Sequence, residues 1–224
     1  MGGCQSGEAD ELDVEEGGSD ASTPAPVILI SDPGQDLDDE MALMMSRFLV
    51  HKKLLDLRGV VVTLHPAFDR ARLCRGTLDI LGLFDVPVGV GSDGGDVKHQ
   101  HKGSTFEHWA SGYMPTGESE RATHIQPGGL LLFQLYVQAE PKSLSLVIIA
   151  SLKDPALFLR DNEDLFARKT RQVVIMGGVE KWDSSTSVED IVLTPDSAHN
   201  QSFDKEASAF FYRRCQELQV PLVV

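Results

Sequence analysis

From Val27 onwards, short apolar runs rich in β-branched residues alternate with segments of helical periodicity, and this alternation restricts the fold more than any other feature. The runs predict strands at residues 27–30, 55–64, 86–90, 144–150, 172–176 and 220–224. The segments between them predict helices at residues 38–53, 68–83, 129–139, 155–167 and 204–218. Strands that are apolar throughout are buried on both faces, and strands that alternate with helices pair in parallel. The sequence therefore predicts an α/β fold, an open and mostly parallel sheet with helices on both faces.

The first 26 residues differ from this core in composition. They are polar, and the first 23 contain seven acidic residues and no Lys or Arg, which is half of the net charge of −14. Such a segment has little apolar surface to bury, so we expect a disordered acidic tail at 1–26 and a single domain at 27–224. The negative charge argues against a nucleic-acid-binding surface.

The compartment is predicted from the cysteines and the N-terminus. Cys4, Cys74 and Cys215 are odd in number and widely spaced, so they predict neither a disulfide framework nor a zinc site, and a cytoplasmic location is expected. Gly2 with Ser6 fits the myristoylation pattern, and Cys4 could carry a second acyl chain. Weak membrane association is the alternative if Gly2 and Cys4 are acylated.

An acidic cluster follows the first predicted strand. Five acidic residues fall within the nine positions from Asp32 to Glu40, in the stretch "SDPGQDLDDE". Carboxylates this close repel one another unless a positive charge shares the site. A solvated turn is one explanation, and helix capping is another, with Asp36 capping a helix that starts at Leu37. A ligand site is the third, because ligands of α/β sheets bind beyond the carboxyl ends of the strands.

Two later strand ends are expected at the same edge of the sheet. "ASLKDPA" follows the fourth strand and "VVIMGGV" contains the fifth, where Gly177 and Gly178 permit close approach of the backbone. Two long loops, at about 91–126 and 177–199, interrupt the alternation. His99, His101 and His108 lie in the first of these loops. No fourth ligand stands at a spacing typical of zinc sites, so a solvated loop is favoured over a zinc site.

Together these stretches resemble the nucleoside hydrolase family in its inosine–uridine-preferring branch, over residues 27–224. "SDPGQDLDDE" is similar to the signature Asp-x-Asp-Pro-Gly-x-Asp-Asp, and "VVIMGGV" is similar to the Met-Gly-Gly strand of the family. "LTPDSAHNQSFDKEAS" resembles the segment after that strand, and "ASLKDPA" takes the place of a Gly-Pro-Leu-Thr-Asn-x-Ala turn.

The resemblance implies a hydrolase that cleaves the N-glycosidic bond of ribonucleosides with a calcium-activated water. It implies that Asp32 ligates Ca²⁺ and acts as general base. Asp39 and the main-chain carbonyl of Lys153 would be further calcium ligands. Asp38 and Asn200 would bind ribose hydroxyls. The implied partner is a small-molecule nucleoside, and members of the family are commonly homo-oligomers.

Several positions depart from the family pattern. Ile30 replaces the first Asp of the signature, two extra residues precede Asp38, and Ala198 stands where Glu is expected. The family continues for about another third of its length and supplies a His-Asp pair from there. We therefore expect a domain that is incomplete at its C-terminus and nearly inactive, unless His108 or His199 completes the site. The alternative function is a catalytically impaired relative that binds a metal, a ribosyl ligand or a protein partner.

Overall fold

The computed structural model describes residues 23–35, 37–95, 106, 124–182, 185, 187 and 191–224. The tail up to residue 22, the acylation sites Gly2 and Cys4, the Asp36 cap and the loop histidines lie outside these residues. The predictions that concern them therefore stay predictions.

The described residues form one sheet of seven strands in which each neighbouring pair is parallel. The strands are β1 (Ala25–Ser31), β2 (Leu55–Val62), β3 (Val88–Val90), β4 (Gln126–Pro127), β5 (Leu144–Ile148), β6 (Thr170–Ile175) and β7 (Leu222–Val223). Their order across the sheet is β4-β3-β2-β1-β5-β6-β7. The predicted α/β fold with a parallel sheet is confirmed.

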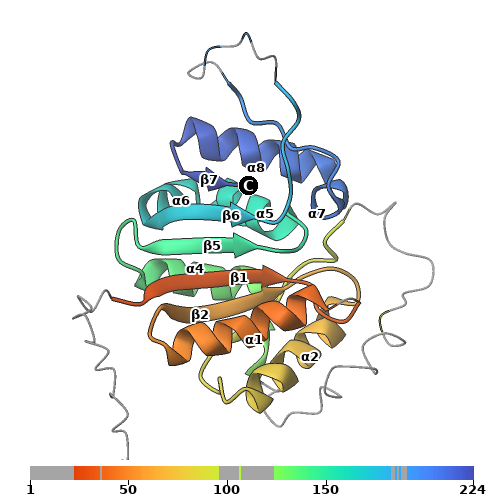
Figure 1. Ribbon diagram of the computed structural model, residues 1–224, viewed down its shortest axis with the longest axis vertical. Helices are drawn as coiled ribbons and strands as arrows, with labels where there is room; N and C mark the ends of the chain where they lie inside the picture. The colour runs from red at the N-terminus through yellow and green to blue at the C-terminus, as the bar shows by residue number, and fades with distance from the viewer. Residues whose placement is uncertain are drawn as a thin grey trace, which may run out of the picture.

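The helices cover both faces of the sheet (Figure 1). They are α1 (Asp38–His51), α2 (Ala67–Ile80), α4 (Gly128–Gln138), α5 (Lys153–Asp161), α6 (Glu163–Lys169), α7 (His199–Ser202) and α8 (Lys205–Glu217). One buried cluster joins α4, α5, α6 and α8 to the sheet, and a second joins α1 and α2 to it. None of the described helices is long and apolar enough to cross a membrane.

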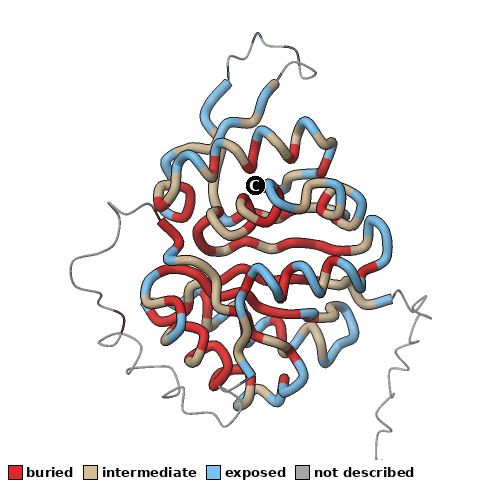
Figure 2. The backbone as a smooth tube through the Cα atoms, turned by 180° about the vertical axis from the view of Figure 1, so that it is seen from behind, coloured by how far each residue is buried: buried red, intermediate tan, exposed pale blue. Residues whose placement is uncertain are grey.

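Strand β1 shows why the apolar runs predicted this fold. Ile28 and Ile30 belong to the first buried cluster, whereas Val27 and Leu29 belong to the second. Alternate side chains of a strand point to opposite faces, so a strand covered on both faces must be apolar at every position. Figure 2 shows the resulting band of buried backbone through the middle of the molecule.

Some element boundaries differ from the prediction. Strand β1 begins at Ala25, two residues before the predicted start, because the Ala25 amide donates to the carbonyl of Leu54. The helix predicted at 155–167 is two helices, since Asn162 leaves the helical backbone and its side-chain amide donates to the carbonyl of Phe158. Helix α1 starts at Asp38, and its N-cap residue Leu37 makes no side-chain capping bond. The short elements β4 and α7 were not predicted.

The strand order distinguishes one point along the carboxyl edge of the sheet. Chain order runs outward from β1 to β4 on one side and from β5 to β7 on the other, so it reverses between β1 and β5. In open α/β sheets the crevice at the carboxyl end of such a reversal is where ligands bind. The loop from Asp32 follows β1, and Ile149 follows β5, so both flank this point.

Candidate active site

The loop after β1 is fastened by Asp39. The Ser31 hydroxyl donates to Asp39 Oδ1 over 2.5 Å, and the Asp32 main-chain N–H donates to the same oxygen over 3.0 Å. Asp39 is 2 % exposed, so its carboxylate is held inside the molecule by these donors. Its first-turn position in α1 lets Asp39 reach the main chain of Asp32, and a calcium-binding role for both residues stays a prediction.

A buried cation packs against the same loop. Arg70, on α2, is 3 % exposed, and its Nη1 donates to the carbonyls of Asp32 (2.6 Å) and Pro33 (2.8 Å). The ring of Phe106 lies 5.1 Å from Arg70 Cζ, within the range of a cation–π contact. The Arg70 charge offsets part of the repulsion among the carboxylates. No sequence pattern indicated this role of Arg70, because its partners are main-chain carbonyls.

Gly34 makes this packing possible. Its φ is +106°, and a Cβ there would lie 2.3 Å from a ring carbon of Phe106. Both the backbone conformation and the close approach favour glycine, which explains the Pro-Gly turn of the motif.

A pocket of about 240 Å³ opens between this loop and the ends of β5 and β6. Its lining residues come from four segments of the chain: Asp32, Gln35, Asp38, Ile149, Met176, His199, Asn200 and Phe203. Three predicted site residues, Asp32, Asp38 and Asn200, therefore meet in one pocket at the topological switch point. Its volume is below the ~300–1,000 Å³ of pockets for drug-sized ligands and suits a smaller ligand.

Asn200 joins two strand ends. Its Nδ2 donates to the carbonyls of Ile149 (3.0 Å) and Met176 (3.3 Å), which follow β5 and β6. These bonds use the donors of the amide, and within the described part of the chain no group donates to its Oδ1. Asn200 can therefore accept a hydrogen bond from a ligand in the pocket but has no further donor for it.

His199 adds an imidazole to the same pocket. Its ring lies 4.7 Å from the ring of Phe203 in an edge-to-face arrangement at 71°. Both side chains line the pocket, so one wall is aromatic. A planar heterocycle can stack on such a wall, and an imidazole can also exchange a proton with it.

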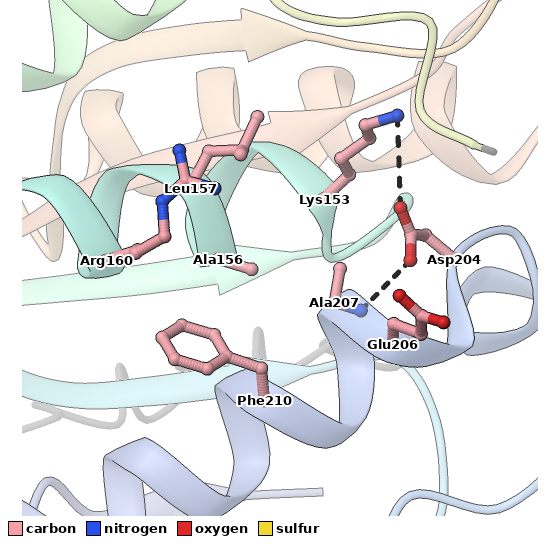
Figure 3. A pocket seen from close by; sticks show the side chains of 8 residues that line it. All are labelled: Lys153, Ala156, Leu157, Arg160, Asp204, Glu206, Ala207 and Phe210. Atoms are coloured by element: carbon pink, nitrogen blue, oxygen red, sulfur yellow. Dashed lines mark hydrogen bonds and ion pairs between the residues drawn. The ribbon is translucent and has the colours of Figure 1, made fainter.

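Lys153 lies apart from this pocket. Its Nζ donates to the carbonyl of Gly95 and lies 3.9 Å from Asp204 Oδ2. With Asp204 it lines a neighbouring pocket of about 230 Å³ between α5 and α8, where Asp204 also accepts the N–H of Ala207 (Figure 3). The side chain therefore anchors a loop and a helix start. A calcium-binding role for the Lys153 main-chain carbonyl stays a prediction.

Another acidic residue, Asp154, links the ends of two strands by hydrogen bonds. It accepts hydrogen bonds from the Thr63 hydroxyl (2.6 Å), the Ser92 amide (2.8 Å) and the Ser92 hydroxyl (2.8 Å). These donors follow β2 and β3, whereas Asp154 lies in the first turn of α5. Asp154 was not among the predicted site residues, because no sequence pattern around it distinguishes it from an ordinary acidic residue at a helix start.

The donor set can be compared with the needs of Ca²⁺. Calcium prefers six to eight oxygen ligands, mostly carboxylates and carbonyls. Asp32 and Asp39 provide carboxylates of the right kind, and the main-chain N–H of Asp32 donates to the Asp39 carboxylate. Among residues placed in the structure, however, no three His, Cys, Asp or Glu side chains are grouped to hold a metal ion. The residues thus fit a calcium ion in kind, with water or main-chain oxygens needed to complete its shell.

The chain resembles known proteins over most of its length. The profile of the family "Inosine-uridine preferring nucleoside hydrolase" matches residues 27–224. The protein of that description from Crithidia fasciculata is 29 % identical over 191 residues, which are 79 % of this chain and 56 % of the relative. The chain therefore spans little more than half the length of this relative.

Solved structures agree with the family match. The type III effector protein XopQ, in complex with adenosine diphosphate ribose, is 29 % identical with a TM-score of 0.73, covering 90 % of this chain and 56 % of that one. The purine-preferring ribonucleoside hydrolase from Gardnerella vaginalis shares the fold, with 20 % identity, a TM-score of 0.65, and coverage of 88 % and 59 %. The profile match over residues 27–224 shows that this chain belongs to the inosine-uridine preferring nucleoside hydrolase family.

Proposed function

We propose that this chain binds a ribonucleoside in the pocket at the β1/β5 switch point and hydrolyses its N-glycosidic bond. The observation that carries the proposal is that Asp32, Asp38 and Asn200 line one pocket, although they come from opposite ends of the sequence. Two carboxylates and an amide oxygen offer hydrogen-bond acceptors, which match the hydroxyl donors of a ribose.

The side chains would divide the work as follows. Asp32 accepts a proton from the attacking water. The water thereby becomes a stronger nucleophile while the sugar becomes oxocarbenium-like. Asp38 and the Oδ1 of Asn200 accept hydrogen bonds from ribose hydroxyls and fix the ring against Asp32. The Nδ2 bonds of Asn200 to Ile149 and Met176 hold that Oδ1 in place.

Calcium is the proposed cofactor. Asp32, Asp39 and the main-chain carbonyl of Lys153 would hold it. A bound Ca²⁺ would neutralise the carboxylates and lower the pKa of a coordinated water. The Ser31 and Asp32 donors on Asp39 would keep that carboxylate oriented for the ion.

A second candidate is binding of a ribosyl ligand without hydrolysis. The XopQ structure, 29 % identical over 90 % of this chain, holds adenosine diphosphate ribose. In addition, Ala198 stands where the family pattern has Glu beside Asn200. Both candidates use the same ribose-binding residues and differ in whether the bond is cleaved.

One pair of measurements separates them. Release of free base from inosine and uridine would be followed with added Ca²⁺, and binding of inosine and ADP-ribose would be measured by calorimetry. Hydrolysis that Asp32→Asn abolishes would support the first candidate, and binding without base release would support the second. Asp69→Asn is the matched control, because Asp69 lies on α2 in an exposed pair with Arg72, outside the pocket. If the wild-type chain neither binds nor hydrolyses these ligands, both candidate functions are overturned.

A further inference from the structure

Two buried side chains of opposite charge hold the main chain of Asp32. Its N–H donates to Asp39 Oδ1 over 3.0 Å, and its carbonyl accepts from Arg70 Nη1 over 2.6 Å. Asp39 is 2 % exposed and Arg70 is 3 % exposed, so water competes little for either bond. Because both main-chain groups are held, the direction in which the Asp32 side chain leaves the backbone is fixed. That side chain lines the pocket at the β1/β5 switch point.

Arg70 is itself held in place on α2. The same Nη1 donates to the carbonyl of Pro33 over 2.8 Å, and Nε donates to the carbonyl of His65 over 3.3 Å. The ring of Phe106 lies 5.1 Å from Arg70 Cζ. A planar guanidinium that is held on several sides places its donors with little freedom. The loop that begins at Asp32 is therefore fastened to the body of the domain through Arg70.

Arg70 also supplies a positive charge that does not depend on a metal ion. Carboxylates crowd the stretch from Asp32 to Glu40, and they repel one another where no cation is bound. Arginine stays protonated throughout the physiological pH range, so its charge offsets part of this repulsion before calcium binds. A buried charge is costly unless polar groups face it, and three main-chain carbonyls accept hydrogen bonds from this one. The arrangement allows the loop to keep its form in the calcium-free chain.

Arg70 acts on the pocket through Asp32. It is not among the residues that line the pocket, whereas Asp32 is. The two proposed ribose ligands are fastened independently of Arg70, since Asp38 begins α1 and Asn200 is bonded to the ends of β5 and β6. Loss of the Arg70 contacts should therefore displace the proposed base and calcium ligand more than the ribose contacts.

We propose that Arg70 is a positioning residue, which holds Asp32 in its pocket-facing place in the calcium-free chain, so that this carboxylate is preformed for calcium and for the attacking water. The kinetic consequences rest on the proposed function, whereas the preformed loop is measurable without it. Removing a residue that orients a metal ligand typically costs about 10- to 100-fold in metal affinity or activity. A displacement of about 1 Å at a reacting group can slow the reaction by about 100-fold.

Arg75 provides a matched control on the same helix. It is 4 % exposed, and its guanidinium donates to the main-chain carbonyls of Val86 and Leu83, outside the pocket. Arg75→Met therefore removes the same kind of buried contact as Arg70→Met without touching the loop after β1. Arg70→Lys and Arg75→Lys form a milder pair that keeps the charge, and they carry the test if a methionine variant does not fold.

Amide exchange of the calcium-free chain is the first test. In Arg70→Met, the Asp32 amide should exchange about tenfold faster than in wild type, when each rate is taken relative to the core amides of β5. Arg70→Lys should show a smaller increase, because its ammonium keeps the charge but lacks the planar group. Neither Arg75 variant should change this ratio. An Asp32 amide that exchanges equally in the Arg70 and Arg75 variants would overturn the proposal, whether or not the chain is an enzyme.

Calcium titration and inosine hydrolysis are the second test. Arg70→Met should raise the calcium dissociation constant and lower kcat at saturating calcium, each by about 10- to 100-fold, with KM within about twofold of wild type. Both Arg75 variants should match wild type in all three quantities. If the wild-type chain neither binds nor cleaves inosine, the proposed function fails, and the exchange ratio alone decides the role of Arg70. If the wild type is active and Arg70→Met leaves kcat unchanged, the proposed function stands and the positioning role is overturned.

Discussion

The hydroxyl of Ser31, the last residue of β1, lies 2.5 Å from the Oδ1 atom of Asp39 in the first turn of α1. The same oxygen accepts the main-chain N–H of Asp32. A proposed calcium ligand is thus also a structural acceptor that joins a strand end to the following helix. Variants of Asp39 are therefore expected to change stability as well as ligand binding.

Asp39→Ala should destabilise the chain even without a ligand. The Ser31 hydroxyl and the Asp32 amide would lose their acceptor in a buried place, which typically costs about 1–3 kcal/mol in the free energy of unfolding. Urea unfolding of the calcium-free chain measures this loss. Asp38→Ala, at the exposed neighbouring carboxylate, should stay within about 0.5 kcal/mol of wild type. Equal stability of the two variants would contradict the structural role of Asp39.

Calcium binding should depend on Asp32. Replacing Asp32 with Ala removes a proposed carboxylate ligand and should abolish the binding isotherm in a calorimetric titration with CaCl₂. The control variant is Asp69→Asn, whose affinity should equal that of wild type. If Asp32→Ala still binds calcium normally, the carboxylates after β1 do not form the metal site.

The sequence could predict the sheet because burial on both faces leaves a direct mark. Every residue of "VILI" in β1 is buried, and the short length and β-branched residues of such an apolar run indicate a strand. Short elements leave no such mark: β4 has two residues and α7 has four, so neither shows a repeating pattern. The break at Asn162 involves a local side-chain bond to the carbonyl of Phe158, which the apolar pattern of the segment does not show.

The candidate site was predictable where a motif carried it. Asp32, Asp38 and Asn200 were identified through the family resemblance, and the structure places them around one pocket. Arg70 and Asp154 were missed because their partners are main-chain groups and hydroxyls from distant strands. Such contacts follow from strand order, which the one-dimensional pattern does not specify.

Glu40 should make stability depend on pH. Desolvation raises the pKa of its carboxyl above the ordinary value, and the hydrogen bond from the Thr77 hydroxyl offsets only part of this. A raised folded-state pKa favours the folded state below the ordinary carboxyl pKa of about 4.3, and this contribution is lost as the pH rises through the folded-state value.

The test variant is Glu40→Gln, which is neutral at every pH and can still accept from Thr77. Its thermal midpoint should exceed that of wild type at pH 7 and match it near pH 4. A gain of the same size at both pH values would show that desolvation of the Glu40 carboxylate is not the cause.

Gly178 should not tolerate a side chain. A Cβ there would lie 2.1 Å from Asp196 Oδ2, and Asp196 is held because its Oδ1 accepts the Ala198 N–H over 2.8 Å. Gly178→Ala must move this segment, at a cost of typically ~1–3 kcal/mol for an overpacked site. Chemical denaturation measures the loss. Gly129→Ala, at a position with open space around its Cβ, is the matched control and should be close to neutral.

The donors of Asn200 should be needed for stability, separately from any ribose contact of its Oδ1. Asn200→Ala leaves the carbonyls of Ile149 and Met176 without their side-chain donor, at an expected cost of about 1–3 kcal/mol that does not vary with pH. Asn200→Asp is nearly isosteric but sets a carboxylate oxygen against these carbonyls at neutral pH. Protonation restores an O–H donor there, so the folded state raises the pKa of the new carboxyl.

The stability deficit of Asn200→Asp should therefore be larger at pH 7 than at pH 4, while that of Asn200→Ala stays constant relative to wild type. Urea unfolding at the two pH values measures both deficits. A pH-independent deficit in Asn200→Asp would show that the side chain does not face the two carbonyls, and the bridge between the ends of β5 and β6 would then have to lie elsewhere.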